Sequence, residues 1–382
     1  MDARISEEQE LLRQSARDFL ERECPISLVR AQMDDPIGLP EALWKQMAEL
    51  GWLGLVIDES HDGSGLGLVD VAVLLEEMGR VLCPGPFVST AVAGALAIQW
   101  AGSPEQKRTL LPEIARGGLR LAFAQLEDEA SWAASAVGLR AEPDGRGHRL
   151  TGRKRFVLDA PCANRLIVVA RCQDAAQGLA DDIGLFLVDP EAGGVETRTI
   201  AYNEETRKLG EVRFDGAIAE PLGDPRGAGP LLDRVLALAR VATCAELCGS
   251  TQRVLELSVE YAGNREQFGQ PIGRFQSIQH KCANMLVQTE GIRSAAYYAA
   301  WALEAEEPDA LTMACLAKAY CGEAAAAVSA EGIQIHGGLG FTWEQDLHLY
   351  FKHARAAEFA WGDPTECREQ AARDLIDVPA PL

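Results

Sequence analysis

Several features are scarce or missing in this sequence of 382 residues. Its 10 cysteines include no Cys-x-x-Cys pair, which disfavours zinc sites and dithiol redox chemistry, and we expect no bound metal. No apolar run approaches the ~20 residues that a membrane-spanning helix needs. The first ten residues are polar and acidic, unlike a signal peptide. These absences predict a cytoplasmic protein that is not a membrane protein.

Basic residues are also few: 36 Lys and Arg stand against 57 Asp and Glu, a formal charge of −21. Nucleic acids and anionic membranes bind through clusters of Lys and Arg, so we expect neither as a partner. Any anionic ligand needs a locally basic site or a helix N-terminus. Hydrophobic residues make up 47% of the chain, which is typical of a globular protein, and its length allows two or three domains.

The first third of the chain has the pattern of helices. Ser6 is a candidate N-cap, and Gln9 follows three residues later, as in a capping box. Apolar residues then recur at helical spacing through Leu20. Three further segments continue the helical pattern: 43–50, 68–82 and 91–115. Together they predict an N-terminal helical domain over residues 1–117.

Near Gly118 the pattern changes to short apolar or alternating runs, which are typical of strands. The strand candidates are 119–125, 137–141, 148–151, 166–171, 183–188 and 211–214. The turn dipeptide Asp144-Gly145 predicts a hairpin between two of them. We expect a middle β-barrel or sandwich domain over residues 118–224.

The helical period then returns for most of the remaining chain. Four long segments carry it: 231–263, 275–304, 310–336 and 344–360. Long helices with short links favour an antiparallel four-helix bundle, here over residues 225–382. The predicted fold class is therefore α+β, with a helical domain, a β domain and a helical bundle in that order.

This order of domains and several local motifs resemble the acyl-CoA dehydrogenase family. Residues 265–272 read Arg-Glu-Gln-Phe-Gly-Gln-Pro-Ile and are similar to the family's Arg-x-x-Phe-Gly-x-x-Ile stretch. Residues 334–340 read Gln-Ile-His-Gly-Gly-Leu-Gly and are similar to its Gln-x-x-Gly-Gly-x-Gly turn. The resemblance covers essentially the whole chain. It implies an FAD-dependent oxidoreductase that desaturates an acyl-CoA thioester in fatty acid or steroid β-oxidation, with electron-transfer flavoprotein as the electron acceptor.

The resemblance also implies which residues contact FAD. They are Arg265, Gln267, Phe268, Gln334, Gly337 and Gly338 in the C-terminal region, and Gln125, Ser131 and Phe156 in the β domain. An arginine can pair with a phosphate in a fork, and glycine lets backbone approach a pyrophosphate. Without the resemblance, Arg265 is an ordinary solvated charge and the two glycines cap a helix. In the family the C-terminal motifs reach the FAD of a neighbouring subunit, which implies a dimer or tetramer.

The family's catalytic base has no counterpart at its usual place. Most members carry a glutamate just before a glycine, and that position falls on Trp361 here. A minority carry it on an earlier helix before an arginine, and that position falls on Ala239. Neither side chain accepts a proton at neutral pH. In this vicinity Glu358, Asp363 and Glu366 are the nearest candidates for a relocated base. Asp363 is the best of the three, although an exposed charge at a helix end is the alternative for it.

The β domain departs from the family pattern as well. The loop that in the family reads Thr-Glu-Pro-x-Ala-Gly-Ser-Asp reads Gln-Leu-Glu-Asp-Glu-Ala-Ser-Trp at residues 125–132. Its three consecutive acids are expected to face solvent. Phe156 can still stack on a flavin ring, although an ordinary place in a strand core is the alternative, and Leu158 cannot donate the family's hydrogen bond.

Three explanations fit the missing carboxylate. The chain is a non-catalytic subunit that forms an α2β2 heterotetramer with a base-bearing paralogue, as in bacterial enzymes for bulky acyl-CoAs. Alternatively it is an active homodimer or homotetramer with a relocated base, or a flavoprotein that oxidises a non-thioester substrate.

Overall fold

The computed structural model describes residues 5–145, 147–172 and 182–376. Two compact units make up the chain. The first unit contains Met1–Val29, Leu68–Cys83 and Arg240–Leu382, and the second contains Arg30–Gly67 and Pro84–Ala239. The domain boundaries predicted at residues 117 and 224 rest on changes of secondary structure along the chain. The first compact unit instead combines helices from both ends of the chain.

The second unit holds a β-barrel with short helices around it. Its seven-stranded sheet contains β1 (Leu121–Ala124), β2 (Arg140–Asp144), β3 (Gly147–Leu158), β4 (Arg165–Cys172), β5 (Ile183–Val188), β6 (Val195–Ile200) and β7 (Leu209–Pro221). Its helices are α3 (Glu41–Glu49), α5 (Ala95–Ala101) and α6 (Pro104–Ala115), with a π-helical segment at Val88–Gly94, and α2 (Ile26–Asp34) crosses into it.

The barrel closes because β5 pairs with both β4 and β7. Around the ring β4 also pairs with β2, β2 with β3, and β3 with β7. Every residue of β5 is buried, which explains its continuous apolar sequence. The inner face is filled by aliphatic and aromatic side chains, among them Leu150, Val168 and Phe186. The predicted middle β-barrel is therefore present.

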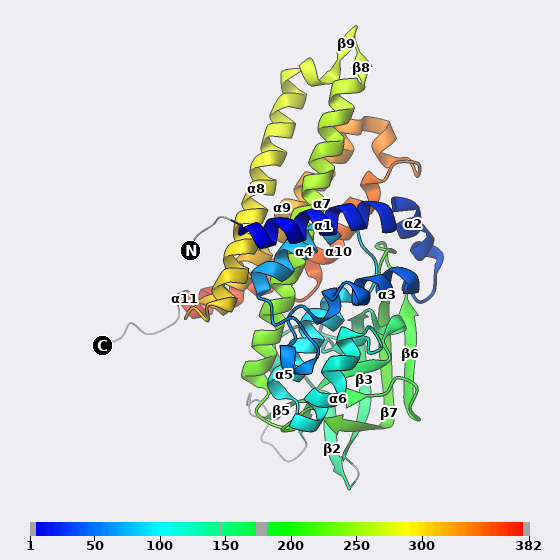
Figure 1. The fold of residues 1–382 in the computed structure, drawn as a ribbon, viewed down its shortest axis with the longest axis vertical. Coiled ribbons are helices and arrows are strands. Elements are labelled where there is room, and N and C mark those ends of the chain that lie inside the picture. The colour runs from blue at the N-terminus through cyan, green and yellow to red at the C-terminus, as the bar shows by residue number, and fades with distance from the viewer. Residues whose placement is uncertain (1–4, 146, 173–181, 377–382) are drawn as a thin grey trace, which may run out of the picture. The chain divides into compact units, whose positions relative to one another are not determined.

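The first unit is a bundle of helices. Its members are α1 (Glu7–Glu23), α4 (Leu68–Arg80), α8 (Gln276–Glu304), α9 (Ala310–His336), α10 (Leu347–Phe359), α11 (Pro364–Leu375) and most of α7 (Gly229–Asn264). Ser6 caps α1 and forms the predicted capping box with Gln9. Between α7 and α8 the chain forms a two-stranded hairpin of β8 (Glu266–Gln267) and β9 (Gln270–Pro271), drawn at the tips of both helices in Figure 1. Helices on both sides of one β segment confirm the predicted fold class.

Two glycines allow α4 and α7 to cross at backbone contact. A Cβ at Gly79 would overlap the carbonyl oxygen of Glu246, and a Cβ at Gly249 would overlap that of Glu76. Both glycines are buried, and Gly249 lies in the middle of α7, where glycine is otherwise unfavourable. The close approach of the two helices therefore depends on the absence of side chains at these positions.

Candidate functional site

Arg265, Gln267 and Phe268 lie on the hairpin at the tips of α7 and α8. All three are exposed, and the Phe268 side chain is 92% exposed. Phe268 and Gly269 adopt left-handed φ values of 54° and 77°, the conformation that a two-residue hairpin turn requires. The Arg265 N–H donates to the carbonyl of Tyr261 at 2.8 Å, which fixes the root of the hairpin to α7. The turn thus holds an arginine and an aromatic ring toward solvent.

The second motif forms the end of α9. Gln334 is exposed on its last turn, and Gly337 ends the helix with φ 60° and ψ −136°, a region open only to glycine. A Cβ at Gly337 or Gly338 would meet nothing within 4 Å. The backbone of this turn therefore lies open to an incoming group.

One ring contact brings the two C-terminal motifs together. Tyr261, four residues before Arg265, stacks on His336, just before the glycines, with ring centroids 4.2 Å apart. The stack joins the part of α7 that leads into the arginine-bearing hairpin to the part of α9 that leads into the open glycine turn. This combination fits a pyrophosphate, because arginine binds phosphate by paired hydrogen bonds and glycine allows close backbone approach. The predicted residues of this region could therefore hold part of FAD, which would supply the hydride-accepting ring when bound.

The predicted residues of the β domain lie together in the second unit. Gln125 follows β1, and its side-chain amide donates to the carbonyl of Trp132 at 2.6 Å, while its side-chain oxygen Oε1 is buried without a hydrogen-bond partner. The Ser131 hydroxyl accepts the N–H of Ala133 at 3.2 Å. Phe156 sits at a register shift in β3 with φ 53° and is 36% exposed, so the bulge turns its ring away from the regular strand direction. A partly exposed aromatic ring beside this loop fits a flavin.

The acids of this loop do not all face solvent, so that expectation was wrong for Glu127. Its carboxylate accepts a hydrogen bond from the buried Lys154 ammonium at 2.7 Å. Asp128 is half-exposed and pairs with Arg153 and Arg155. Two of the three acids, Glu127 and Asp128, are therefore paired with basic residues of β3, a pairing that the linear sequence did not reveal.

The usual base position carries a buried indole. Trp361 is 2% exposed and has φ 63° in the turn between α10 and α11. Its carbonyl oxygen accepts a hydrogen bond from Nε of Arg240 at 2.8 Å. Arg240 lies in α7, directly after the buried Ala239 at the alternative base position. The hydrogen bond from Arg240 therefore connects the two positions at which the family carries its base.

Two buried cations hold this turn in place. Lys318 of α9 is fully buried and donates to the carbonyls of Glu358 and Gly362 at 2.8 and 2.9 Å. Arg240 also donates to the Cys315 sulfur at 3.0 Å. A hydrogen bond from Cys315, assisted by both cations, lowers the pKa of the Cys367 thiol to about 7. The sequence did not reveal this cluster, because its members come from three separate helices, α7, α9 and α11.

Asp363 serves as the N-cap of α11. Its Oδ1 accepts the backbone N–H groups of Thr365 at 2.7 Å and of Glu366 at 2.9 Å. Pro364 follows at the first helical position, a common partner of such a cap. The geometry gives this carboxylate a structural task at the start of the last helix.

Replacing Asp363 by alanine is expected to destabilise the protein by about 1 kcal/mol, because the two N–H groups lose their acceptor. Asp363→Asn keeps an oxygen at the same place and is expected to retain most of the stability. Urea unfolding of the two variants and the parent measures the difference. Equal stability of the alanine variant and the parent would contradict a capping role.

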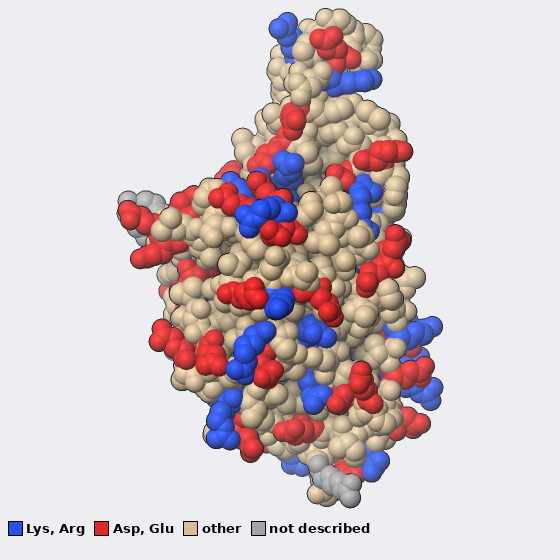
Figure 2. All heavy atoms as spheres, turned by 45° about the vertical axis from the view of Figure 1, so that its right-hand side comes forward, with Lys and Arg blue, Asp and Glu red and all other residues tan. Residues whose placement is uncertain are grey.

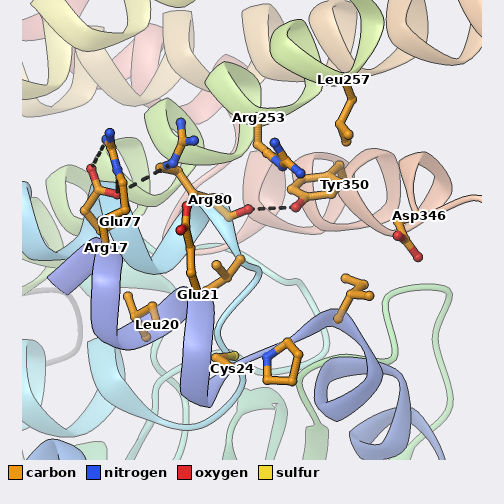
Figure 3. A pocket seen from close by; sticks show the side chains of 13 residues that line it. Arg17, Leu20, Glu21, Cys24, Glu77, Arg80, Arg253, Leu257, Asp346 and Tyr350 are labelled. Carbon is orange, nitrogen blue, oxygen red and sulfur yellow. Dashed lines mark hydrogen bonds and ion pairs between the residues drawn. The ribbon is translucent and has the colours of Figure 1, made fainter. Parts of the chain in front are cut away.

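The first unit contains a cavity of about 450 Å³ between α1, α4, α7 and α10, shown in Figure 3. Its arginines are paired with acids: Arg17 donates to Glu77 at 2.7 and 2.9 Å, and Arg80 pairs with Glu256 at 2.8 Å. The Tyr350 hydroxyl donates to the Arg80 carbonyl at 2.7 Å, and none of the predicted site residues lines the cavity. With its arginines paired in this way, the cavity is not assigned to an anionic ligand.

Three further observations concern surface charge, hydropathy and possible metal ligands. On the face drawn in Figure 2 acidic and basic side chains are interspersed, without one large patch of either sign. Within the described residues no helix combines the length and the apolar character needed to cross a membrane. In the same part of the chain no group of three or more His, Cys, Asp or Glu side chains is arranged to hold a metal ion.

The fold and these motifs define a flavoprotein of mixed helical and β structure, and comparisons with known proteins identify the family. The family model "Acyl-CoA dehydrogenase, N-terminal domain" matches residues 6–118, and "Acyl-CoA dehydrogenase, C-terminal domain" matches residues 227–376. Acyl-CoA dehydrogenase IpdE2 of Mycobacterium tuberculosis is 32% identical over 98% of this chain and 99% of its own length. The chain therefore belongs to the acyl-CoA dehydrogenase family, whose members are FAD-dependent oxidoreductases.

Solved structures agree with this assignment. A variant of the Tcur3481-Tcur3483 steroid ACAD is 32% identical, with a TM-score of 0.87 over 97% of this chain and 98% of the other. The glutaryl-coenzyme A dehydrogenase complex with glutaryl-CoA is 26% identical, with a TM-score of 0.91 over 99% and 98% of the two chains. The predicted acyl-CoA dehydrogenase fold is thus confirmed.

Proposed function

We propose that the chain is the subunit of an oligomeric acyl-CoA dehydrogenase that completes an FAD site without supplying the catalytic base. The observation that carries this proposal is the contrast between two parts of the first unit. The Arg265 hairpin and the Gly337 turn are exposed and suited to a pyrophosphate, and the Tyr261–His336 stack joins the helices that carry them. The turn at Trp361, in contrast, presents a buried indole where the family has a carboxylate.

The other candidate bases are unsuited to proton abstraction. Ala239 has no ionisable group, and the Oδ1 of Asp363 already accepts two backbone N–H groups. Glu358 is buried, and its carboxylate is engaged in an ion pair with Arg355. A general base must lie within hydrogen-bond reach of the proton that it removes. These constraints favour a base that comes from another chain over a base relocated within this one.

The similar proteins support the oligomeric part of the proposal. One solved relative carries two component names, Tcur3481 and Tcur3483, and is described as a steroid ACAD. By analogy, the partner here is a paralogue with glutamate before the glycine of the α10–α11 turn. The substrate is a bulky acyl-CoA thioester, and the exposed hairpin contacts the FAD of a neighbouring subunit. An electron-transfer flavoprotein then takes the electrons.

Arg265→Ala is expected to weaken FAD binding by about 10- to 150-fold, because a charge-assisted hydrogen bond contributes about 1.5–3 kcal/mol. The exposed position predicts a change in unfolding free energy of no more than about 0.5 kcal/mol. The measurement is the FAD content and dissociation constant of the protein isolated with any chain that co-purifies.

Two variants make this test specific. Arg265→Lys keeps the charge but loses the fork and is expected to bind FAD with intermediate affinity. Arg274→Ala removes another exposed cation from the same stretch, outside the motif, and is expected to bind FAD normally. Normal FAD binding by Arg265→Ala would contradict the proposed role of the hairpin.

A further inference from the structure

The loop between β1 and β2, residues 125–139, is held by one buried ion pair. Lys154 of β3 is fully buried, and its Nζ donates to the Gln125 carbonyl at 2.8 Å and to Oε1 of Glu127 at 2.7 Å. The Glu127 carboxylate also accepts the N–H groups of Gly138 at 3.1 Å and Leu139 at 2.9 Å. A single ammonium and a single carboxylate therefore tie the beginning and the end of the loop to the same strand.

Removing the Lys154 charge from water costs free energy, so the ion pair is a distinctive feature of this loop. Burial lowers the pKa of Lys154 to about 8, although the neighbouring Glu127 favours the charged form. Removing one partner of a buried ion pair leaves the other uncompensated, whereas replacing both by uncharged groups is much less harmful. The contacts involve two backbone N–H groups and one carbonyl of the loop, so they act on its conformation and not only on its charge.

The strand that carries Lys154 also presents Phe156. The register of β3 against β7 shifts between Lys154 and Val157, and Phe156 takes a left-handed φ of 53° at this bulge. The backbone N–H of Arg155 donates to the carbonyl of Leu126 at 2.8 Å, which continues the attachment of the loop to the strand. The ion pair thus lies at the base of the loop and strand that carry the three candidate flavin contacts of this unit.

We propose that Lys154 and Glu127 are positioning residues of the flavin site, whose buried ion pair fixes the 125–139 loop before FAD binds. Their pairing holds Gln125, Ser131 and Phe156 in the arrangement that the flavin ring contacts. Pre-organisation of this kind raises affinity because the loop loses no conformational freedom on binding. This role rests on the proposed function, since it requires that the protein binds FAD.

Lys154→Met keeps the length of the side chain and removes the charge. It is expected to weaken FAD binding about tenfold or more, because two hydrogen bonds of a charged group are lost. The amides of Gly138 and Leu139 should then exchange faster with solvent, and the visible absorption bands of bound FAD should shift. The double variant Lys154→Met/Glu127→Gln leaves no unpaired charge and is expected to recover part of the affinity.

Arg153→Met is the matched control. It breaks an ion pair between the same strand and the same loop, but both side chains of that pair are about half-exposed, so its contribution is small. This variant is expected to match the parent in FAD affinity and in the absorption bands.

The outcomes distinguish a failure of the positioning role from a failure of the proposed function. If Lys154→Met is less stable but binds FAD with the affinity and spectrum of the parent, the pair is only structural and the positioning role is overturned. If the double variant recovers none of the FAD affinity, the ion-pair explanation is overturned as well. If the parent and Arg153→Met bind no FAD in any assembly, the proposed function itself fails, and the positioning role fails with it.

Discussion

Flavin reduction by an acyl-CoA is expected to be slower by about 10²–10⁴-fold in this chain alone than in an assembly with a base-bearing paralogue, the range attributed to one general base. The residue at the usual position, Trp361, has no proton acceptor, and the hydrogen bonds of Asp363 go to the α11 backbone. The measurement is anaerobic bleaching of the flavin absorbance after rapid mixing with a panel of saturated acyl-CoA thioesters.

Two variants decide between the explanations of the missing base. In the assembly, a glutamate-to-glutamine change in the paralogue is expected to abolish bleaching, because this change removes the only carboxylate assigned to the proton. Asp363→Asn in the present chain is expected to have no effect, since asparagine still caps α11. Rapid bleaching by the chain alone that disappears in Asp363→Asn would establish a relocated base instead. A flavin that is reduced only by a non-thioester substrate would favour the third explanation.

The helical parts of the fold were predictable because their signals are local. The capping box at Ser6 and the apolar spacing of α8 and α9 place these elements within a few residues of their observed bounds. Helix α11 was missed because its buried contacts come from small residues, Cys367 and Ala371, which give little hydrophobic periodicity. Strand β6 was missed because it lies at an edge, pairs only with β7 and has no fully buried face.

Charged residues explain the errors in the β domain. The strand predicted to end at Thr151 continues to Leu158, through the polar run Gly-Arg-Lys-Arg. Polar residues at 152–155 do not suggest a buried strand, yet Lys154 turns inward because Glu127 and a carbonyl oxygen satisfy its charge. Such a pairing depends on tertiary structure, so a single sequence does not show it.

The candidate site was predictable as a set of motifs but not as an arrangement. The family resemblance names Arg265 and Gly337, while the Tyr261–His336 stack that joins the helices carrying them is visible only in the structure. The same holds at the missing base: Arg240 and Lys318 fix the backbone of the α10–α11 turn through its carbonyls. This framework does not depend on the side chain at position 361, so a turn that has lost its carboxylate can keep its shape.

Gly249→Ala is expected to destabilise the protein by on the order of 4 kcal/mol or more, at the upper end of the effects of single substitutions. A methyl group at this position would overlap the carbonyl oxygen of Glu76, which belongs to the backbone of α4 and cannot move without the whole helix. Overpacking of a rigid contact forces a shift of the backbone, which is more costly than a change of rotamer. Thermal and urea unfolding of the purified variant measure the loss.

Gly263→Ala provides a matched control in the same helix. Gly263 is exposed near the end of α7, and a Cβ there would meet nothing within 4 Å. Because alanine favours helix over glycine by up to about 1 kcal/mol, this variant is expected to be as stable as the parent or slightly more stable. A Gly249→Ala variant as stable as Gly263→Ala would show that α4 and α7 are not in backbone contact. The stability changes expected for the two alanine variants have opposite signs. Comparing them separates the effect of the helix crossing from the intrinsic helix preference of alanine over glycine.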